Sequence, residues 1–477
     1  MDRLHDLRLG STTLAEFDTD ASPACQLAEQ IVAYEENGMK IHFRASVVSL
    51  LAFVWCSFSQ AQPVASPTVI ERKSAIPAEF FGLVVQRAHM TTKWPSVPFG
   101  AWRIWDSYLK WADIQPAPGV WNFESFDRQV SLGLQNEKEL TYTLGQTARW
   151  ASVSGDEKHA WGMGTGGMPK RMEDWKSYVE AVVTRYKGRI KVYEVWNEPK
   201  YSDALGRCRG AIFFCGKPDD LVKLAAVAHE VIKRVDPAAR LATPGFTDSI
   251  RGAAALDAYL SAGGARYTDI ASFHFYELHP EKGWETAQEI KRVLAKNGLA
   301  NVPIWNTEVG YLVQTRAGEV KAEWDVGPFS RVFSPAEAGA RMARVHIVAA
   351  SAGVERVFWY AWDSKHMGMI DPADQIPNQM TVSYRVVRRW LVGATISCGG
   401  RPVMDTWQCD VSNSGRTAKL VWKSEIGQTS LLLPGTGPRL VEGLDESRAQ
   451  AKGGAIIPWD GAPVLVVSDG KPWYFSR

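Results

Sequence analysis

The sequence has 477 residues, 20 of them tryptophan, and a formal net charge of +2. A charge this close to neutral gives no reason to expect a nucleic-acid partner. Hydrophobic residues make up 45% of the chain and charged residues 22%, as in a globular protein with a sizeable core. The many tryptophans weakly favour a carbohydrate-binding site over plain packing, because an indole face stacks well on a sugar ring.

A secretion signal is predicted near the N-terminus. Residues 39–44 are basic, Ala45–Phe58 is almost wholly apolar, and Ser59-Gln-Ala61 fits a small-x-small cleavage site. The apolar run is too short to span a bilayer comfortably. The alternative to a signal peptide is that the run forms a buried helix. We expect residues 1–38 to be a non-native upstream extension and 39–61 to be a signal peptide or N-terminal anchor. The protein is then periplasmic or secreted, and an uncleaved segment would associate with the inner membrane.

The cysteines agree with export. Beyond the signal, four remain in two close pairs, Cys208 with Cys215 and Cys398 with Cys409. An even number at short spacing in an exported chain predicts two local disulfides. Zinc is the alternative, but neither pair has the spacing of a zinc knuckle, so no metal site is expected.

Eight strand-like runs alternate with amphipathic stretches between residues 78 and 395. The predicted strands are Phe80–Gln86, Ala101–Trp105, Leu140–Leu144, Lys191–Trp196, Arg240–Thr243, Asp269–Phe275, Val302–Asn306 and Arg356–Tyr360. The predicted helices are Trp175–Tyr186, Asp220–Val235, Thr286–Lys296, Pro335–Ala352 and Val382–Leu391. This α/β pattern predicts a TIM (β/α)8 barrel. A doubly wound sheet is the alternative, but no strand leads into a dinucleotide-type glycine turn, and no cofactor motif is present.

The pattern changes after the last barrel helix. Short strands with Gly, Asn and Pro turns follow, and residues 396–477 are expected to form a small all-β sandwich. The predicted strands are Arg416–Trp422, Ser430–Leu433, Ala455–Ile457 and Val464–Val467. Residues 62–77 are expected to be a linker or to add a strand to this module.

Two of the predicted barrel strands end in a glutamate. Lys191-Val-Tyr-Glu-Val-Trp-Asn-Glu-Pro199 stops at a proline, which cannot donate to a sheet ladder and leaves Glu198 at the carboxyl end. A second such strand, Val302-Pro-Ile-Trp-Asn-Thr-Glu308-Val-Gly310, follows, and its glutamate lies 110 residues later (308 − 198). Because TIM-barrel active sites lie at the carboxyl ends of the strands, the two glutamates suggest a two-carboxylate enzyme.

Alternation along the strands extends the candidate site. On residues 269–276 the polar side chains His274 and Tyr276 share the inward face, where Tyr276 could hydrogen-bond Glu308. The same alternation puts Glu194, Trp196 and Glu198 on one face of their strand. Glu194 would lie a layer deeper, where a buried carboxylate needs a cation, and Arg103 is the candidate partner for it or for Glu308.

Several motifs in this order resemble the clan A retaining glycoside hydrolases. Val195-Trp-Asn-Glu-Pro199, His274-Phe-Tyr276 and Trp305-Asn-Thr-Glu308 carry the clan pattern. Phe99-Gly-Ala-Trp-Arg-Ile-Trp-Asp106, Leu144-Gly-Gln-Thr-Ala-Arg-Trp-Ala-Ser152 and Tyr384-Arg-Val-Val-Arg-Arg-Trp-Leu-Val-Gly-Ala394 are similar to family 39, in particular to its PslG-type exopolysaccharide hydrolases.

The resemblance implies roles for individual residues. Glu198 would be the acid/base and Glu308 the nucleophile of a double displacement on a β-glycosidic bond, with the two carboxyl groups about 5–5.5 Å apart. Asn197 would hydrogen-bond the sugar 2-hydroxyl, and Tyr276 and Arg103 would hold Glu308 ionised and oriented. His274, Trp362 and Trp150 are further candidates for substrate contact, Trp362 as the floor under the cleaved sugar.

The implied partner is therefore a polysaccharide or oligosaccharide, and neither a metal nor a cofactor is needed for this chemistry. A β-xylosidase-like exo-glycosidase, a transglycosylase and a non-catalytic carbohydrate-binding barrel are the alternatives. Two loops could shape the site. The loop at 206–218 would be stiffened by the Cys208–Cys215 disulfide, and the loop at 154–171 is expected to be a mobile flap over a sugar cleft.

Overall fold

The computed structural model describes residues 69–473, apart from 203–212, 248, 317–329, 372, 400–401 and 403–404. The predicted extension 1–38 and signal 39–61 lie outside the described residues, and so does Cys208 of the first predicted disulfide. In the part of the chain that is described, no helix is both long and apolar enough to cross a membrane.

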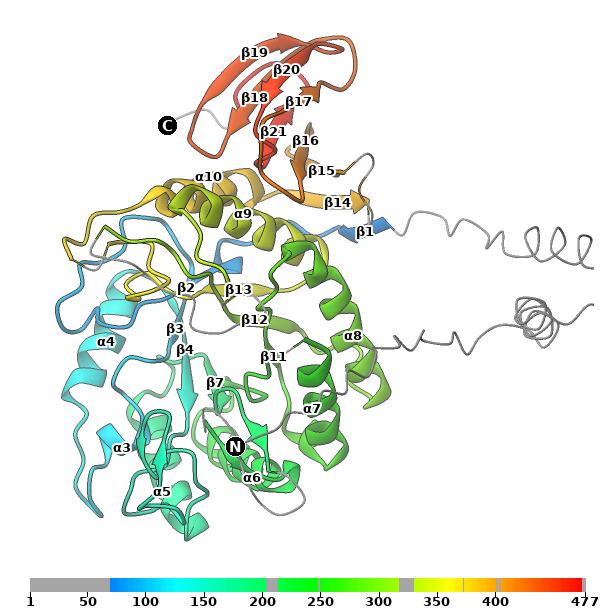
Figure 1. Ribbon diagram of the computed structural model, residues 1–477. Helices are drawn as coiled ribbons and strands as arrows, with labels where there is room; N and C mark the ends of the chain where they lie inside the picture. The colour runs from blue at the N-terminus through cyan, green and yellow to red at the C-terminus, as the bar shows by residue number, and fades with distance from the viewer. Residues whose placement is uncertain are drawn as a thin grey trace, which may run out of the picture. The chain divides into compact units, whose positions relative to one another are not determined.

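Eight parallel strands form the barrel, and all eight predicted strands are confirmed (Figure 1). They are β2 (Phe81–Val84), β3 (Ala101–Ile104), β4 (Glu139–Leu144), β7 (Val192–Val195), β10 (Arg240–Ala242), β11 (Ala271–His274), β12 (Ile304–Val309) and β13 (Arg356–Trp359). They pair in the order β10-β7-β4-β3-β2-β13-β12-β11. Parallel bridges Ala242↔Ile270 and Phe246↔Phe273 join the two end strands and close the ring.

Helices follow most of the barrel strands. They are α3 (Trp111–Ile114), α4 (Glu124–Gln135), α5 (Met172–Arg185), α6 (Pro218–Val235), α7 (Ser249–Ser261), α8 (Gly283–Lys296), α9 (Pro335–Ser351) and α10 (Gln379–Leu391). Short 3-10 turns are η1 (Ala78–Phe80), η2 (Gly264–Tyr267) and η3 (Pro280–Lys282). The start of α9 illustrates the local signals, because Pro335 is the first helical residue and Ser334 and Glu337 cap each other's backbone N–H groups.

The barrel interior is layered. At the amino ends of the strands an apolar layer fills the ring, formed by Ala101, Val192, Ala242, Ile270, Trp305 and Phe358. The next inward positions along the strands are polar, and they include Arg103, Glu194 and Ser272, none of which is exposed to solvent. A floor of apolar side chains thus supports buried charged groups, which in turn lie below the carboxyl ends of the strands where TIM-barrel sites form.

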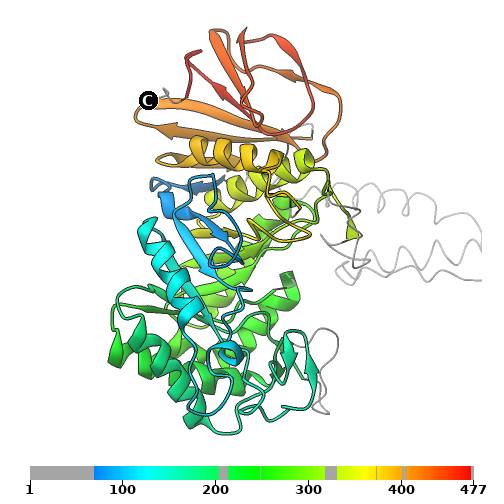
Figure 2. The same cartoon turned by 90° about the vertical axis from the view of Figure 1, so that its left-hand side faces the viewer.

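An all-β module packs beside α9 and α10 (Figures 1 and 2). Its larger sheet contains β1 (Val69–Arg72), β14 (Thr395–Gly399), β15 (Thr406–Asn413), β16 (Arg416–Lys423), β21 (Val464–Val467), β18 (Pro438–Gly443) and β19 (Arg448–Lys452) in that order. Its smaller sheet is the pair β17 (Thr429–Leu432) and β20 (Ile456–Trp459). The predicted contribution from residues 62–77 is confirmed by β1, and the predicted Cys398–Cys409 disulfide joins β14 to β15.

Much of the tryptophan serves packing. Among the described residues, eight tryptophans are less than 2% exposed, namely Trp102, Trp111, Trp175, Trp196, Trp305, Trp359, Trp390 and Trp422. Trp422 and Trp407 of the β module stack at 6.3 Å, and Trp407 contacts Trp284 of α8 at 5.0 Å. The high tryptophan content is therefore largely explained by the core and by the junction between barrel and β module.

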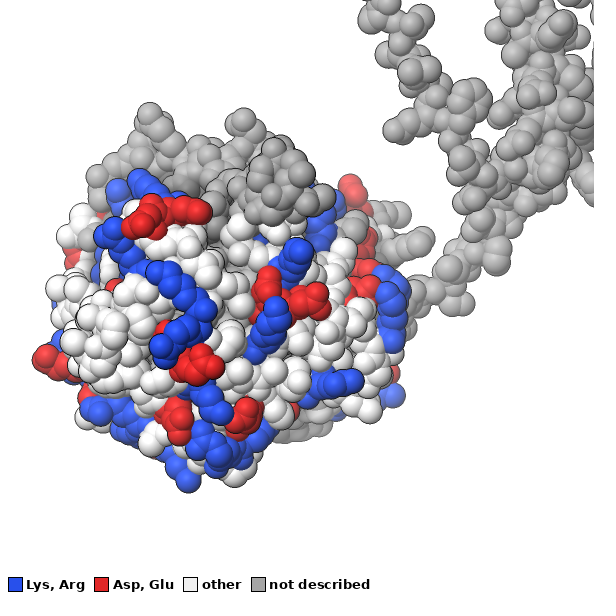
Figure 3. All heavy atoms as spheres, turned by 90° about the horizontal axis from the view of Figure 1, so that it is seen from below, with Lys and Arg blue, Asp and Glu red and all other residues white. Residues whose placement is uncertain are grey.

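The surface charges are interspersed. On the face shown in Figure 3, basic and acidic side chains alternate without a large patch of one sign. Many such charges are paired between neighbouring helices, as Lys176 of α5 is with Glu230 of α6 at 2.7 Å, and Arg234 of α6 is with Glu180 of α5 at 3.0 Å. This distribution agrees with the formal charge close to zero.

Candidate active site

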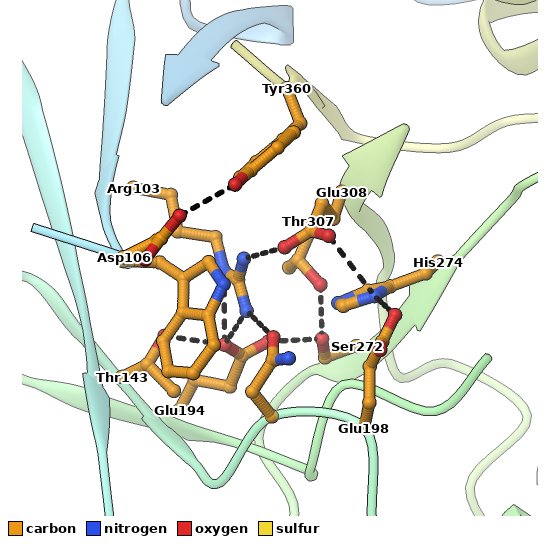
Figure 4. A network of polar contacts seen from close by, with 12 residues as sticks. Arg103, Asp106, Thr143, Glu194, Glu198, Ser272, His274, Thr307, Glu308 and Tyr360 are labelled. Carbon is orange, nitrogen blue, oxygen red and sulfur yellow. Dashed lines mark hydrogen bonds and ion pairs between the residues drawn. The ribbon is translucent and has the colours of Figure 1, made fainter. Parts of the chain in front are cut away.

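The two predicted glutamates meet at the carboxyl ends of their strands (Figure 4). One carboxylate oxygen of Glu198, one of Glu308 and a ring nitrogen of His274 all lie within 4.8 Å of one another. Glu198 is half-buried and Glu308 is 6% exposed. Two carboxyl groups at this separation can act on opposite sides of one glycosidic bond.

Glu198 does not reach the site by simple strand alternation. Strand β7 ends at Val195, and Trp196 and Glu198 both adopt positive φ angles, 72° and 44°. Trp196 therefore packs outward, at 6.4 Å from Trp175 of α5, instead of sharing the inward face of Glu194 as predicted. The turn that follows directs Glu198 over the barrel, where positive φ in non-glycine residues often marks functional strain.

Glu308 also departs from alternation. The ladder between β11 and β12 shifts register at Phe273/His274, and that between β12 and β13 shifts between Asn306 and Val309. Because Trp305 belongs to the apolar floor and Thr307 contacts Ser272 inside the barrel, regular alternation would direct Glu308 outward. The irregular pairing instead brings Glu308 into the site, as bulges next to active sites commonly do.

Arg103 is the centre of the buried charge network (Figure 4). It binds Glu194 at 2.6 Å, Glu308 at 2.8 Å and the Asn197 side-chain oxygen at 2.7 Å. Glu194 also accepts hydrogen bonds from Thr143, at 2.7 Å, and from Ser272. The structure thus places Arg103 as the partner of both predicted carboxylates.

Burial and charge act in opposite directions on this network. Burial disfavours the charged guanidinium, but Glu194 and Glu308 outweigh burial and raise the pKa of Arg103. Burial likewise disfavours the ionised form of Glu194, but Arg103, His274 and the hydrogen bonds from Ser272 and Thr143 outweigh it and lower the pKa of Glu194. Arg103 and Glu194 are therefore a stable ion pair below the reactive groups.

The pKa of Glu308 is raised, contrary to the expectation that Arg103 and Tyr276 would lower it. Burial is the largest cause, and the negative charge of Glu198 adds to it, against the opposing effects of His274, Arg103 and the Tyr276 hydroxyl. Burial thus outweighs Arg103, whose single positive charge is also paired with Glu194. The contacts to Glu308 nevertheless orient its carboxylate, since Tyr276 donates to Oε1 at 2.9 Å and Arg103 to Oε2.

Replacing Tyr276 with phenylalanine should shift the pH profile. The hydroxyl stabilises the ionised form of Glu308, so its loss raises the pKa of Glu308 further. An attacking carboxylate must be ionised, and activity is therefore lost as pH falls through that pKa. We expect the acid limb of kcat/KM to move about 1 pH unit towards higher pH in Tyr276→Phe.

The matched control for that variant is Tyr193→Phe. The hydroxyl of Tyr193 is buried and finds no hydrogen-bond partner among the described residues. Its removal should leave the acid limb where it is in the wild type. A profile of Tyr276→Phe that coincides with that of Tyr193→Phe would show that the Tyr276–Glu308 contact does not govern ionisation.

His274 and Arg103 lie too deep to contact a substrate directly. Neither side chain is exposed to solvent, and His274 Nδ1 lies 2.8 Å from the Glu198 carboxylate. Gly245 makes room for this ring, because a Cβ at that position would lie 2.6 Å from His274 Nε2. His274, a candidate for substrate contact in the sequence, is placed instead as a positioning residue for Glu198, and Arg103 contacts Glu308 and Asn197.

The two predicted tryptophan contacts are less favourably placed. Trp362 is 2% exposed and donates its indole N–H to the Lys93 carbonyl, so it offers a sugar ring little free surface. Trp150 donates to the Gln115 carbonyl and lines a separate surface pocket with Lys170. Asn197 is better suited, because Arg103 binds its side-chain oxygen and the amide N–H groups are left to donate.

The loop at 154–171 is tied to its neighbours by hydrogen bonds, and the mobile flap stays a prediction. It contains the hairpin of β5 (Lys158–His159) and β6 (Gly162–Met163), and Thr147 Oγ1 binds the Gly167 carbonyl at 2.6 Å. Its Gly166 carbonyl also accepts from the Cys215 N–H at 2.8 Å, which connects it to the ribbon of β8 (Lys200–Tyr201) and β9 (Cys215–Gly216) behind Glu198. This hydrogen bond joins the hairpin to the ribbon.

Sequence reasoning missed a polar group at the ends of β2, β3 and β13. Asp106, which has a φ of 52°, accepts a hydrogen bond from Tyr360 at 2.6 Å and another from Gln86. Burial raises the pKa of Asp106 to about 6, the Tyr360 hydroxyl opposes this, and the charge of Glu308 adds to it. The available signal was the position of Asp106 just after Trp105, at the end of a barrel strand.

Known proteins match this chain in fold and in part of its sequence. The model of glycosyl hydrolase family 10 matches residues 104–251, a segment that contains Glu198 and ends before Glu308. Endo-1,4-beta-xylanase 3 of Hypocrea jecorina is 27% identical over 136 residues, which are 28% of this chain and 36% of the xylanase. The chain thus spans about a third of the length of that relative.

Solved structures match the chain over its barrel and its β module together. A glucosidase from Croceicoccus marinus has a TM-score of 0.56 at 13% identity, covering 84% of this chain and 98% of that protein. The GH39 enzyme of Xanthomonas axonopodis pv. citri has a TM-score of 0.55 at 13% identity, covering 83% and 95%. A GH30 endoxylanase of Clostridium papyrosolvens has a TM-score of 0.53 at 9% identity, and the match covers 84% of this chain and 98% of that protein. At these identities the likeness establishes the barrel-plus-β fold.

Proposed function

We propose that this protein is a retaining glycoside hydrolase that cleaves β-glycosidic bonds of a polysaccharide. The observation that carries the proposal is the approach of the Glu198 and Glu308 carboxylates to within 4.8 Å, on the face of the barrel where active sites form. Retaining enzymes hold their two carboxyl groups about 5–5.5 Å apart, whereas inverting enzymes need about 6.5–9.5 Å to admit a water molecule. The sequence and fold matches to glycosidases support the same reaction.

The reaction follows from the two environments. In the first step a Glu308 oxygen attacks the anomeric carbon, the bond to the leaving oxygen breaks, and Glu198 gives that oxygen its proton. In the second step water attacks the anomeric carbon, Glu198 takes the water proton, and the bond to Glu308 breaks. Arg103 and Tyr276 hold Glu308 in line, His274 holds Glu198, and Asn197 is free to donate to the sugar 2-hydroxyl.

The proposed substrate is a bacterial exopolysaccharide, and the enzyme is proposed to belong to family 39 and to act after export to the periplasm or beyond. The sequence motifs that resemble the PslG-type hydrolases support this choice. The partial match to an endo-1,4-beta-xylanase favours β-1,4-xylan as the second candidate. Initial rates on purified exopolysaccharides and on xylan, measured as released reducing ends, distinguish the two.

Replacement of Glu198 by alanine tests the mechanism. The variant should lose about 10²–10⁴-fold in kcat on substrates with poor leaving groups, because their departure needs the proton. On an activated 4-nitrophenyl β-glycoside the first step no longer needs that proton, and azide should restore turnover by attacking the glycosyl-enzyme. The product is then a β-glycosyl azide, which NMR identifies.

Three outcomes would contradict the proposal. Azide could fail to accelerate Glu198→Ala, the first sugar released by the wild type could be the α-anomer, or Glu198→Ala could match the wild type on all substrates. Glu198, His274 and Glu308 also have the spacing of a metal site, so EDTA is a further control. Since neither proposed step uses a metal, EDTA should leave kcat/KM unchanged.

A further inference from the structure

The two catalytic carboxylates and His274 together form a set of three metal ligands. One oxygen each of Glu198 and Glu308 and one ring nitrogen of His274 all lie within 4.8 Å of one another. Figure 4 shows the three side chains pointing towards one another from different strand ends. Three protein ligands from histidine and carboxylate side chains, with a water molecule in the fourth position, are typical of open Zn²⁺ sites.

The distances show how far the ligands must move to hold an ion. His274 Nδ1 lies 2.8 Å from Glu198 Oε1 and 4.0 Å from Glu308 Oε1. With bonds of about 2.0–2.2 Å, two ligand atoms of a tetrahedral Zn²⁺ ion are about 3.4 Å apart. Each distance from His274 must therefore change by about 0.6 Å, and the two carboxylate oxygens must approach by no more than about 1.4 Å (4.8 − 3.4).

Glu198 is the ligand that can make this adjustment. Glu308 is held by Tyr276 at 2.9 Å and by Arg103 at 2.8 Å, and the His274 ring is not exposed to solvent. The carboxylate of Glu198 is bound by His274 alone among the described residues, and its side chain is 16% exposed. Two ligands are thus fixed in place while the third can rotate to close on an ion.

Negative charge is in excess at this point of the site. Arg103 is paired with Glu194 and Glu308, and no lysine or arginine in the described part of the chain pairs with Glu198. Burial, and in addition the charge of Glu198, disfavour the ionised form of Glu308 and raise its pKa. A divalent cation between the two carboxylates would offset their repulsion.

The ligand set favours Zn²⁺ and limits how tightly it is held. Imidazole nitrogen suits zinc, whereas Mg²⁺ and Ca²⁺ prefer about six or more oxygen ligands. Binding through Nδ1 of His274 leaves the ring hydrogen on Nε2, which has no hydrogen-bond partner among the described residues. Loss of such a partner typically costs about 10–100-fold in metal affinity. The site should therefore bind Zn²⁺ reversibly, and more weakly than a resident zinc centre.

We propose that Glu198, His274 and Glu308 form a reversible Zn²⁺ site that inhibits the enzyme. A bound ion occupies the oxygens that would protonate the leaving group and attack the anomeric carbon, so metal and substrate exclude each other. The metal site is argued from the geometry alone, and its inhibitory effect rests on the proposed glycosidase function.

Calorimetric titration of the full-length protein with ZnCl₂ tests the site without a substrate. After removal of metals with EDTA and dialysis, the wild type should bind Zn²⁺. Glu198→Gln and Glu308→Gln should each weaken this binding at least about tenfold, because an amide oxygen is neutral and a poorer ligand. His274→Asn should weaken it likewise, and thermal unfolding without metal shows that each variant is folded.

A second histidine–glutamate pair supplies the matched control. His279 lies 3.7 Å from Glu425, and the described residues offer this pair no third ligand. His279→Gln should therefore leave the Zn²⁺ affinity unchanged. Mg²⁺ at the same concentration should not compete with Zn²⁺ for the site.

Initial rates test the inhibitory effect. On a β-glycoside that the wild type cleaves, Zn²⁺ should raise KM and leave kcat unchanged, because the ion competes with the substrate. Mg²⁺ should have no effect, and EDTA should restore the original rate. In protein already freed of zinc, EDTA should change nothing.

Several results would overturn the site. These are equal Zn²⁺ binding by the wild type, Glu198→Gln and Glu308→Gln, a dissociation constant above about 1 mM, or inhibition that lowers kcat without raising KM. Failure of the proposed function looks different. A wild type that cleaves no β-glycoside but binds Zn²⁺ with the expected losses in the variants would overturn the glycosidase proposal and support the metal site.

Discussion

Replacing Glu308 with glutamine is expected to reduce kcat/KM by at least about 10⁴-fold on every substrate that the wild type cleaves. Glutamine keeps the size and the hydrogen-bonding reach of the side chain but cannot form the glycosyl-enzyme. The loss should not depend on the leaving group, because the missing group is the nucleophile itself. Hydrolysis of an activated aryl glycoside gives the most sensitive measurement.

The Glu308→Gln variant should remain folded. Arg103 keeps its bonds to Glu194 when Glu308 becomes neutral, and burial already disfavours the charge of Glu308. Glu139→Gln is the matched control, since Glu139 pairs with Arg356 at the amino ends of the strands, far from the carboxyl ends. Residual activity of Glu308→Gln near that of Glu139→Gln would refute the nucleophile assignment.

Replacing Glu281 with glutamine is expected to cost about 3–5 kcal/mol in the free energy of unfolding. Glu281 lies in η3, is 7% exposed, and accepts two hydrogen bonds from the buried Arg344, at 2.7 and 2.6 Å. It also accepts the indole N–H of Trp422 in β16 at 2.7 Å. The change leaves the Arg344 charge buried without its counter-ion and weakens the junction between barrel and β module.

An exposed pair provides the comparison for this stability prediction. Glu289 and Arg292 interact one helical turn apart on the surface of α8, at 2.5 Å, and Glu289→Gln should cost less than about 1 kcal/mol. Urea denaturation of both variants, followed by tryptophan fluorescence, measures the difference. If the two midpoints shift equally, the buried Arg344–Glu281 pair is not the strong contact that its geometry indicates.

The barrel strands could be predicted because each is a short apolar run that ends at turn-forming residues. Parallel strands buried on both faces need no long-range information to be recognised. The strand β1, which pairs with β14, and the disulfide between Cys398 and Cys409 could also be predicted from short stretches of sequence. The hydrogen bonds that anchor the loop at 154–171 could not be predicted. Thr147 and Cys215 are distant in the sequence from Gly167 and Gly166, whose carbonyls they bind.

The candidate site was predictable in its residue types but not in its backbone. Alternation correctly placed His274 inside the barrel. It failed for Trp196, whose positive φ directs it outward, and for Glu308, which reaches the site through a register shift. Bulges and strained turns depend on the pairing of neighbouring strands, and a single sequence does not show that pairing.

The raised pKa of Glu308 was out of reach for a related reason. The sequence indicates that Arg103 has an acidic partner, but not that one guanidinium serves both Glu194 and Glu308. Asp106 was overlooked because nothing in its neighbourhood indicates that Tyr360 lies 2.6 Å away, 254 residues later in the chain. Contacts of this kind are known only from the folded structure, in which the carboxyl ends of the strands lie together.

The pairing of β1 with β14 bears on how the chain is made. Arg72 pairs with Ile396, 324 residues later (396 − 72), so β1 leaves the ribosome long before its partner exists. At roughly 5–20 residues per second, translation of that interval takes about 16–65 s. The whole barrel can be synthesised during this time. Until β14 is made, the backbone N–H and C=O groups of β1 lack their partner and could pair with other chains. A nascent chain stalled before residue 395 should therefore be more prone to aggregate than one that is released in full.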